Sequence, residues 1–151
     1  MISILAIGKK HEPWVADGIG RYSERLRGAY RLEWSLLPHS SREGSVARDD
    51  ESTRLLSRLK PDDIVVLLDE RGKLLDSPAL SQRLQKHIDR SQHIVIIIGG
   101  AYGVNEKLTQ RANFVLSLSP LVFPHQLVRL IIAEQLYRSQ EIAAGRPYHH
   151  E

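Results

Sequence analysis

The chain has no cysteine among its 151 residues. This absence excludes a disulfide framework, a thiolate metal site and a cysteine nucleophile. Aromatic residues make up only 6% of the sequence, and no apolar run approaches the roughly 20 residues that span a membrane. Residues 1–10 lack a basic region before their short apolar run, which favours a first β-strand over a signal peptide. We therefore expect a cytoplasmic protein that binds neither a membrane nor a metal.

A strong excess of either charge is also missing. The chain has 21 lysines and arginines against 18 aspartates and glutamates, a net charge of +3. Arginine supplies much of the basic charge, and its guanidinium can bind two phosphate oxygens at once. This balance is compatible with a nucleic-acid partner. It is also compatible with a solvated surface that has no partner, and charge alone slightly favours that alternative.

Apolar segments alternate with helical patterns along the chain, and its length suits one domain over residues 1–151. We predict strands at residues 2–8, 30–36, 63–69, 93–98 and 113–118. We predict helices at residues 13–26, 46–59, 77–88, 105–112 and 126–144. Ser77 and Asn105 are the expected N-caps of two of these helices, and a turn is expected at residues 70–73. This order predicts an α/β fold with a mostly parallel sheet covered by helices on both faces.

Two of the strands have patterns that indicate their places in the sheet. Residues 30–36 alternate with a period of two, which is typical of a half-buried strand near an edge. Residues 94–98 are all apolar and β-branched, which favours a central position. Ligands of such folds bind outside the carboxyl ends of the strands. The loops that follow residues 98 and 117 are therefore the first places to look for function.

Gly99, Gly100 and Gly103 form the first of these loops. Glycine allows positive φ angles and a close approach of a ligand to the backbone. The spacing G-G-x-x-G matches neither the dinucleotide fingerprint nor a P-loop. A ligand-binding loop and a tight turn from strand to helix explain these glycines equally well.

Residues 118–125 form the second loop, which Pro120 and Pro124 stiffen. A rigid apolar loop with free backbone amides and carbonyls suits an adenine-like ring. The alternative is an apolar plug over the sheet edge, which the loop taken by itself favours. His125 follows, where a neutral imidazole could accept a proton from a ligand or simply pack at the helix start.

The last predicted helix is apolar over a wide arc, which indicates burial on two sides and hence a subunit interface. The chain continues through residues 147–151, which include Tyr148, His149 and His150. Chain ends are commonly frayed and without function. A ring-rich tail could instead fold over a site and stack on a base.

Several motifs follow one another along the chain: AIGK at 6–9, LDERGK at 68–73, IGGAYG at 98–103, LSLS at 116–119, FPHQLVR at 123–129, EQLYR at 134–138 and PYH at 147–149. In this order and spacing they resemble the RlmH group of SPOUT methyltransferases. The resemblance spans essentially the whole chain. It differs from the group's pattern at Ala101–Tyr102 and at His150, where an arginine is expected. His150 could replace that arginine only when protonated.

The resemblance implies a deep trefoil knot in the C-terminal segments, an exception to the usual absence of knots. It implies S-adenosylmethionine-dependent methylation of N3 of a pseudouridine in helix 69 of large-subunit (23S) ribosomal RNA. It further implies a homodimer that acts on the assembled 70S ribosome.

The resemblance also assigns residues to the site. The implied cofactor contacts are Leu68, Gly99, Gly100, Leu118, Ser119, Pro120, Leu121, Val122 and Phe123. His125, Arg138 and Tyr148 are expected at the target base, with the tail reaching across from the partner subunit. His125 would orient the base or relay its proton, and Arg138 would supply positive charge.

Two other classes of protein were weighed against this one. A nucleotide-dependent oxidoreductase would use the glycine loop for a pyrophosphate, but the fingerprint spacing and the acidic ribose-binding residue are missing. A non-catalytic ribosome-binding protein would explain the basic charge but would leave the stiff apolar loop without a purpose.

Overall fold

A computed structural model describes residues 1–150 of the chain. The elements in chain order are β1 (Ile2–Ile7), α1 (Pro13–Ser23), the 3-10 helix η1 (Gly28–Tyr30), β2 (Leu32–Leu37), α2 (Gly44–Leu56), β3 (Ile64–Leu74), α3 (Ser77–Asp89), β4 (Ile94–Ile98), α4 (Glu106–Arg111), β5 (Phe114–Ser117) and α5 (His125–Ala143). The five strands form one parallel sheet in the order β2-β1-β4-β3-β5. The predicted α/β class is confirmed.

The positions of two strands in the sheet agree with their sequence patterns. β4 lies in the middle of the sheet, and all five of its residues are buried. β2 lies at an edge, and most of its residues are only partly buried. Burial on both faces therefore explains the continuous apolar run of β4, while one solvated side explains the alternation in β2.

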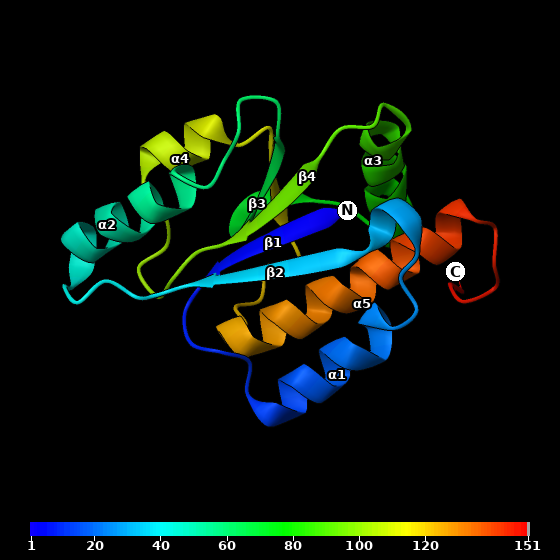
Figure 1. Ribbon diagram of the computed structural model, residues 1–151, viewed down its shortest axis with the longest axis horizontal. Coiled ribbons are helices and arrows are strands. Elements are labelled where there is room, and N and C mark those ends of the chain that lie inside the picture. The colour runs from blue at the N-terminus through cyan, green and yellow to red at the C-terminus, as the bar shows by residue number, and fades with distance from the viewer. Residues whose placement is uncertain (151) are drawn as a thin grey trace.

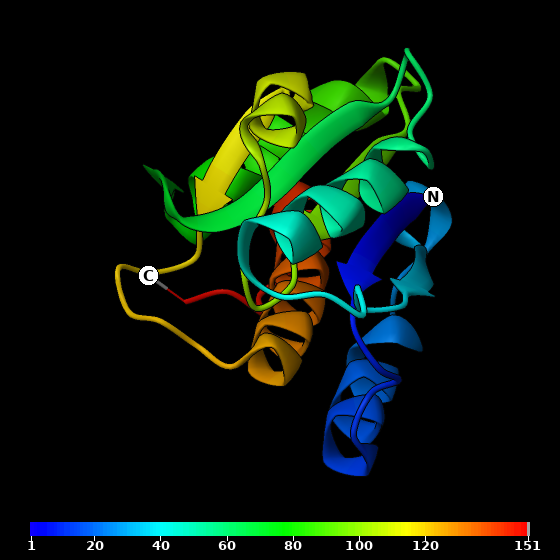
Figure 2. The same cartoon turned by 90° about the vertical axis from the view of Figure 1, so that its left-hand side faces the viewer.

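Helices cover both faces of the sheet (Figures 1 and 2), so the alternating side chains of each strand enter two different cores. On one face Ile4 and Ile96 pack with Leu84 of α3 and Leu136 of α5. On the other face the apolar side chains of the strands pack with those of α2 and α4; this second core includes Leu5, Val65, Ile97, Leu55 and Leu108. The sheet is thus the middle layer of three.

Helix α5 packs against α1 and α3 as well as the sheet. Ala133 of α5 is fully buried with Val15 and Ile19 of α1, and Ile132 faces the core beneath the sheet. The wide apolar arc of this helix therefore has partners within the chain. No helix within residues 1–150 combines the length and the apolar character that a membrane span requires.

Two local predictions are wrong. The expected turn at residues 70–73 is part of β3, which continues to Leu74 and pairs with β5 after a register shift between Leu68 and Lys73. Leu68 and Lys73 both pair with Leu116 of β5, so the charged residues between them lie within an irregularity of the strand and not in a turn. Asp76, not Ser77, caps α3, because its Oδ1 accepts a hydrogen bond from the Ala79 N–H at 2.8 Å.

The expected cap of α4 is confirmed. The side chain of Asn105 accepts a hydrogen bond from the backbone N–H of Leu108 at 3.0 Å. The same asparagine also contacts α2, because its backbone N–H donates to Ser52 Oγ at 2.9 Å. The segment that follows the glycine loop is thereby fixed to α2.

A row of hydrogen-bonded polar side chains links the amino ends of β1, β4 and β3. Ser3 Oγ lies 2.9 Å from His93 Nε2, and His93 Nδ1 lies 3.0 Å from Asp63 Oδ1. Burial alone would raise the pKa of Asp63, but hydrogen bonds from the Lys60 N–H and from His93 outweigh it and lower the pKa. We infer that these hydrogen bonds stabilise the fold at the amino ends of the strands, which lie away from the candidate site.

Candidate functional site

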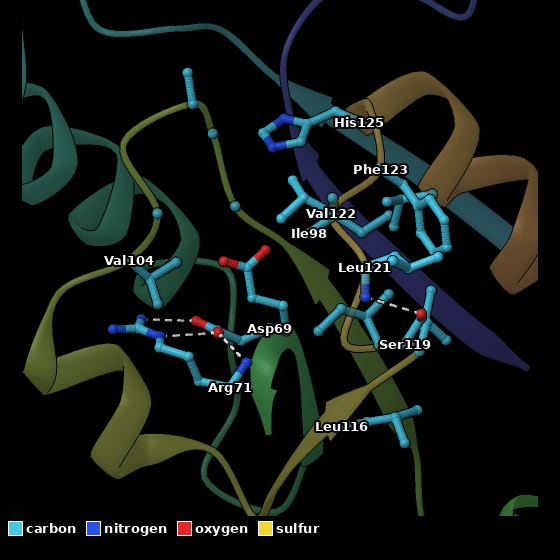
Figure 3. Close-up of a pocket in the computed structure, with 18 residues that line it drawn as sticks. Asp69, Arg71, Ile98, Val104, Leu116, Ser119, Leu121, Val122, Phe123 and His125 are labelled. Atoms are coloured by element: carbon cyan, nitrogen blue, oxygen red, sulfur yellow. Dashed lines mark hydrogen bonds and ion pairs between the residues drawn. The ribbon is translucent and has the colours of Figure 1, made fainter. Parts of the chain in front are cut away.

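A cavity of about 420 Å³ lies where the carboxyl ends of β3, β4 and β5 meet. Its volume falls within the range of about 300–1,000 Å³ that is typical of small-molecule sites. The walls come from residues 68–71 of β3, the glycine loop after β4, and the loop between β5 and α5. Figure 3 shows the labelled side chains of this cavity, with Asp69 and Arg71 across from Phe123 and His125.

The structure brings together most of the residues expected to contact a cofactor. Those that line the cavity are Leu68, Gly99, Gly100, Leu118, Ser119, Leu121, Val122 and Phe123. Pro120 belongs to the same loop and is exposed, but it is not part of the lining. Segments that are 50 residues apart in the sequence thus form one wall, because parallel strands place their carboxyl ends at the same edge.

The glycine loop is both a tight turn and a cavity wall. The Gly103 N–H donates to the Gly100 carbonyl oxygen at 3.0 Å, and Gly103 has a φ of +74°, which favours glycine. A Cβ on Gly99 would come within 2.9 Å of Val104 Cγ1, and one on Gly100 would overlap Glu51 Oε1. The glycines therefore form the expected tight turn, and the same turn borders the cavity.

The loop between β5 and α5 is held by its own side chains. The Ser117 hydroxyl donates to the Ser119 carbonyl at 2.9 Å, and Ser119 Oγ accepts from the Leu121 N–H at 3.0 Å. Leu121 and Val122 are nevertheless 69% and 73% exposed. A plug would bury these two side chains, so their exposure beside the cavity favours the ligand-binding interpretation.

His125 lies at the first residue of α5 and borders the cavity. Its pKa is lowered from the ordinary histidine value, mainly by burial and further by the positive charge of Arg129 and by His39. Glu51 acts in the opposite direction. The imidazole is therefore neutral near pH 7 and can accept a proton.

The structure adds polar wall residues that the sequence analysis missed. Asp69, Glu70 and Arg71 border the cavity from β3. The Arg71 guanidinium donates to both carboxylate oxygens of Asp69 at 3.0 and 2.8 Å, and this hydrogen bonding lowers the pKa of Asp69. The expected turn at residues 70–73 concealed Glu70 and Arg71. The place of all three directly after the buried apolar residues of β3 is the signal that could have identified them.

Arg138 and Tyr148 lie together, away from the cavity. The Arg138 Nε and one terminal nitrogen donate to Glu134 Oε1 at 2.9 and 2.6 Å. The guanidinium carbon lies 4.8 Å from the centre of the Tyr148 ring, and the Tyr148 hydroxyl donates to Glu134 at 3.1 Å. Burial, together with Glu134, raises the pKa of Tyr148 to about 12, so its hydroxyl stays protonated.

The length of α5 separates these two residues from His125. Arg138 follows His125 by thirteen residues in the helix, which corresponds to about 20 Å along the axis. A second hollow of about 620 Å³ lies near Arg138 and includes Ser117, Leu118, Gln135, His149 and His150 in its lining. The last predicted tail residue, Glu151, is outside the described residues. One chain thus has two groups of candidate residues, one at each end of α5.

The site has no arrangement suited to a metal ion. Within residues 1–150, no three His, Asp or Glu side chains gather in a group that could hold one. The polar groups at the cavity wall are instead backbone amides and carbonyls of the glycine loop, the Asp69–Arg71 pair and His125. Such a wall suits an organic ligand with polar and apolar parts.

Comparisons with known proteins agree with this architecture. The model of a family described as "Predicted SPOUT methyltransferase" matches residues 1–149. A protein named Ribosomal RNA large subunit methyltransferase H from Acetivibrio thermocellus is 40% identical over 98% of this chain and 98% of its own length. One of the same name from Alkalilimnicola ehrlichii is 39% identical over 98% and 97%.

A solved structure is similar in fold. The crystal structure of a methylase family protein from Neisseria gonorrhoeae superposes with a TM-score of 0.52 and covers 99% of this chain and 85% of that chain. The two sequences are only 13% identical. This likeness concerns the fold alone.

Proposed function

Because the chain belongs to the SPOUT methyltransferase family, we propose that it methylates N3 of a pseudouridine in helix 69 of large-subunit ribosomal RNA. Family membership confirms the expected class of enzyme, an S-adenosylmethionine-dependent methyltransferase. It also implies the trefoil knot that the sequence resemblance predicts. The nucleotide, the homodimer and the assembled ribosome as substrate are parts of the proposal.

One observation supports the cofactor assignment above all others. Eight of the nine residues that the resemblance assigns to S-adenosylmethionine line one cavity. The apolar loop, with Leu121 and Phe123, suits the adenine ring, and Gly99 and Gly100 add the backbone of the glycine loop to the same wall. When bound, the cofactor supplies a methyl carbon on a positively charged sulfur.

His125 has the properties required at the reacting nitrogen. N3 of the base carries a proton that must leave when the methyl group is added. The lowered pKa of His125 makes its imidazole neutral and thus able to accept that proton or to orient the ring. Its position at the cavity wall supports this role, because the proposed methyl donor would occupy the same cavity.

Arg138 and Tyr148 would act on the charge that develops on the base. Loss of the N3 proton leaves negative charge on the ring carbonyl oxygens, which a guanidinium and a hydroxyl can stabilise. The Arg138 guanidinium is oriented by Glu134, and the Tyr148 hydroxyl remains a donor because of its raised pKa. Their proposed role is therefore to hold the target base.

The separation along α5 supports a homodimer. A pyrimidine ring is far smaller than the roughly 20 Å between His125 and Arg138 on one helix. Arg138 and Tyr148 do not line the cavity that His125 borders, so the proposal assigns them to the second copy. The exposed Leu121 and Val122 give this second copy an apolar surface to contact.

The experiment that tests the proposal uses ribosomes that lack the modification. Purified protein and S-adenosylmethionine are incubated with intact ribosomes, isolated large subunits or free RNA, and the RNA is mapped by mass spectrometry. We expect one methyl group on a helix 69 pseudouridine in intact ribosomes. Methylation of another nucleotide would contradict the substrate assignment. Calorimetry with S-adenosylmethionine and NADH excludes or supports the oxidoreductase alternative.

The composite site makes a sharper prediction. His125→Ala and Arg138→Ala should each abolish most methylation, but an equal mixture that exchanges subunits should recover about a quarter of the wild-type activity. This fraction arises because half of the dimers are mixed and each has one intact site of two. No recovery in subunit-exchanged dimers would exclude a site shared between chains. Near-normal activity of both single variants would contradict the proposed roles of His125 and Arg138.

A further inference from the structure

A buried carboxylate behind the glycine loop has no role in the description so far. Glu51 of α2 is only 3% exposed. Its Oε2 accepts a hydrogen bond from the Ser40 N–H at 2.9 Å, but its Oε1 has no hydrogen-bond partner within residues 1–150. Burying a carboxylate oxygen without a partner is costly, so its presence beside a site requires an explanation.

Glu51 belongs to a compact group of ionisable side chains at the ends of β1 and β4. Its Oε1 fills the place that a Cβ on Gly100 would take, and its Oε2 lies 3.8 Å from His39 Nδ1. Arg129 is 1% exposed, and one of its terminal nitrogens lies 2.9 Å from the Cβ position of Gly8. The glycines at these strand ends leave room for the charged groups.

This group lies behind Gly100, which lines the same cavity as His125, and the charges of Arg129, His39 and Glu51 act on the His125 imidazole. Arg129 is one helical turn further along α5 and also contacts His11, with 3.3 Å between Arg129 NH1 and His11 Nδ1. His39 comes from the loop after β2, and Glu51 comes from α2. The positive charge of Arg129 disfavours protonation of His125, whereas the Glu51 carboxylate favours it.

We propose that Glu51 is a positioning residue whose buried carboxylate is the countercharge that lets His125 take up the proton lost from the target nitrogen. This inference rests on the proposed function. In the step concerned, the N3–H bond breaks and its proton moves to His125. The N3 electron pair bonds to the methyl carbon, and the electrons of the carbon–sulfur bond stay on the sulfur. Glu51 touches none of the reacting atoms.

The negative charge of Glu51 determines the direction of its effect on the pKa of His125. Without Glu51, the nearby positive charge of Arg129 is unopposed, and protonated His125 becomes less favourable. Glu51→Gln keeps an oxygen that can accept from the Ser40 N–H but removes the charge. We therefore expect the His125 titration midpoint to fall. Methylation at the pH optimum should fall by roughly threefold to tenfold.

The first test measures His125 directly in the full-length protein without cofactor or ribosomes. Histidine signals are followed by NMR from pH 4 to pH 8, and His125→Asn identifies the His125 signal. The matched control is Asp49→Asn, because Asp49 is an exposed carboxylate on the same helix that accepts from Asn105 Nδ2 at 3.1 Å. We expect the midpoint to fall in Glu51→Gln and to stay unchanged in the control. Glu51→Asp, which keeps the charge, should restore part of the shift.

The second test measures the pH profile of ribosome methylation for the same proteins. Its acidic limb should move to lower pH in Glu51→Gln together with the NMR midpoint. An unchanged or raised midpoint in a folded Glu51→Gln protein would overturn the inference, as would a shifted midpoint with an unchanged pH profile. If the wild-type protein methylates no ribosomes, the proposed function fails, whereas an unchanged NMR midpoint in an active enzyme overturns only the role of Glu51.

Discussion

Gly100→Ala tests how closely the glycine loop and α2 are packed. The backbone of Gly100 does not have a positive φ, so alanine can adopt its conformation. The added methyl group, however, would overlap Glu51 Oε1 and lie 3.1 Å from Ile7 Cγ2. Neither neighbour is a flexible surface group, because Glu51 is 3% and Ile7 1% exposed. The loop or α2 must therefore move.

The expected cost follows from what such insertions do in packed interiors. An extra methyl group in a well-packed region costs about 1–3 kcal/mol. For a domain of this length, that cost lowers the midpoint of thermal unfolding by about 2–12 °C. If the loop relaxes in the free protein and must return when the cofactor binds, the same energy weakens S-adenosylmethionine binding by about 5- to 150-fold.

Two measurements and one control test this expectation. Scanning calorimetry gives the unfolding midpoint, and isothermal titration gives the cofactor affinity. Gly20→Ala is the control, because a Cβ at Gly20 in α1 has no neighbour within 4 Å. Replacing glycine within a helix should raise the midpoint by about 2–4 °C. Wild-type stability together with wild-type affinity in Gly100→Ala would refute the close packing against Glu51.

Two further predictions concern the parts of the chain away from the cavity. Because the pKa of Asp63 is lowered in the folded protein, its ionised form adds stability above the unfolded pKa of about 3.9, and this stability is lost as the pH falls through the folded value. The advantage of the wild-type protein over Asp63→Asn in urea unfolding should therefore be larger at pH 7 than at pH 3; an equal advantage at both would contradict this. Removing residues 148–151 should abolish methylation but leave cofactor affinity largely unchanged, because Tyr148 contacts Arg138 and Glu134 and does not line the cavity. Loss of cofactor binding in calorimetry would instead assign the tail a structural role.

The sequence predicts the sheet well because its signal is local. Apolar residues at every position predict a strand at Ile94–Ile98, and apolar residues at alternate positions predict one at Leu32–Leu37. The edge and central positions follow from the same burial pattern. By contrast, the continuation of β3 to Leu74 depends on pairing with β5, which lies 40 residues further along the chain. No local pattern encodes that pairing.

The candidate site was predictable to a similar extent. Loops after parallel strands are expected to meet, so the cavity between Gly99 and Phe123 follows from topology. The contribution of Glu51 does not, because a glutamate within a charged helix resembles any solvated residue. Only the tertiary structure shows that it is buried behind Gly100. The apolar arc of α5 predicted a subunit interface, but much of this arc packs on α1, α3 and the sheet within the chain.

The pairing of Arg138 with Glu134 has a consequence for how RNA is selected. A guanidinium already balanced by a carboxylate 2.6 Å away attracts distant phosphates only weakly. This end of α5 therefore does not act as a general trap for polyanions. An anion can form a hydrogen bond with Arg138 only by displacing Glu134 at short range. A misplaced nucleotide therefore gains little binding energy from this arginine. Discrimination then depends on fit rather than on long-range attraction, and it should change little with ionic strength.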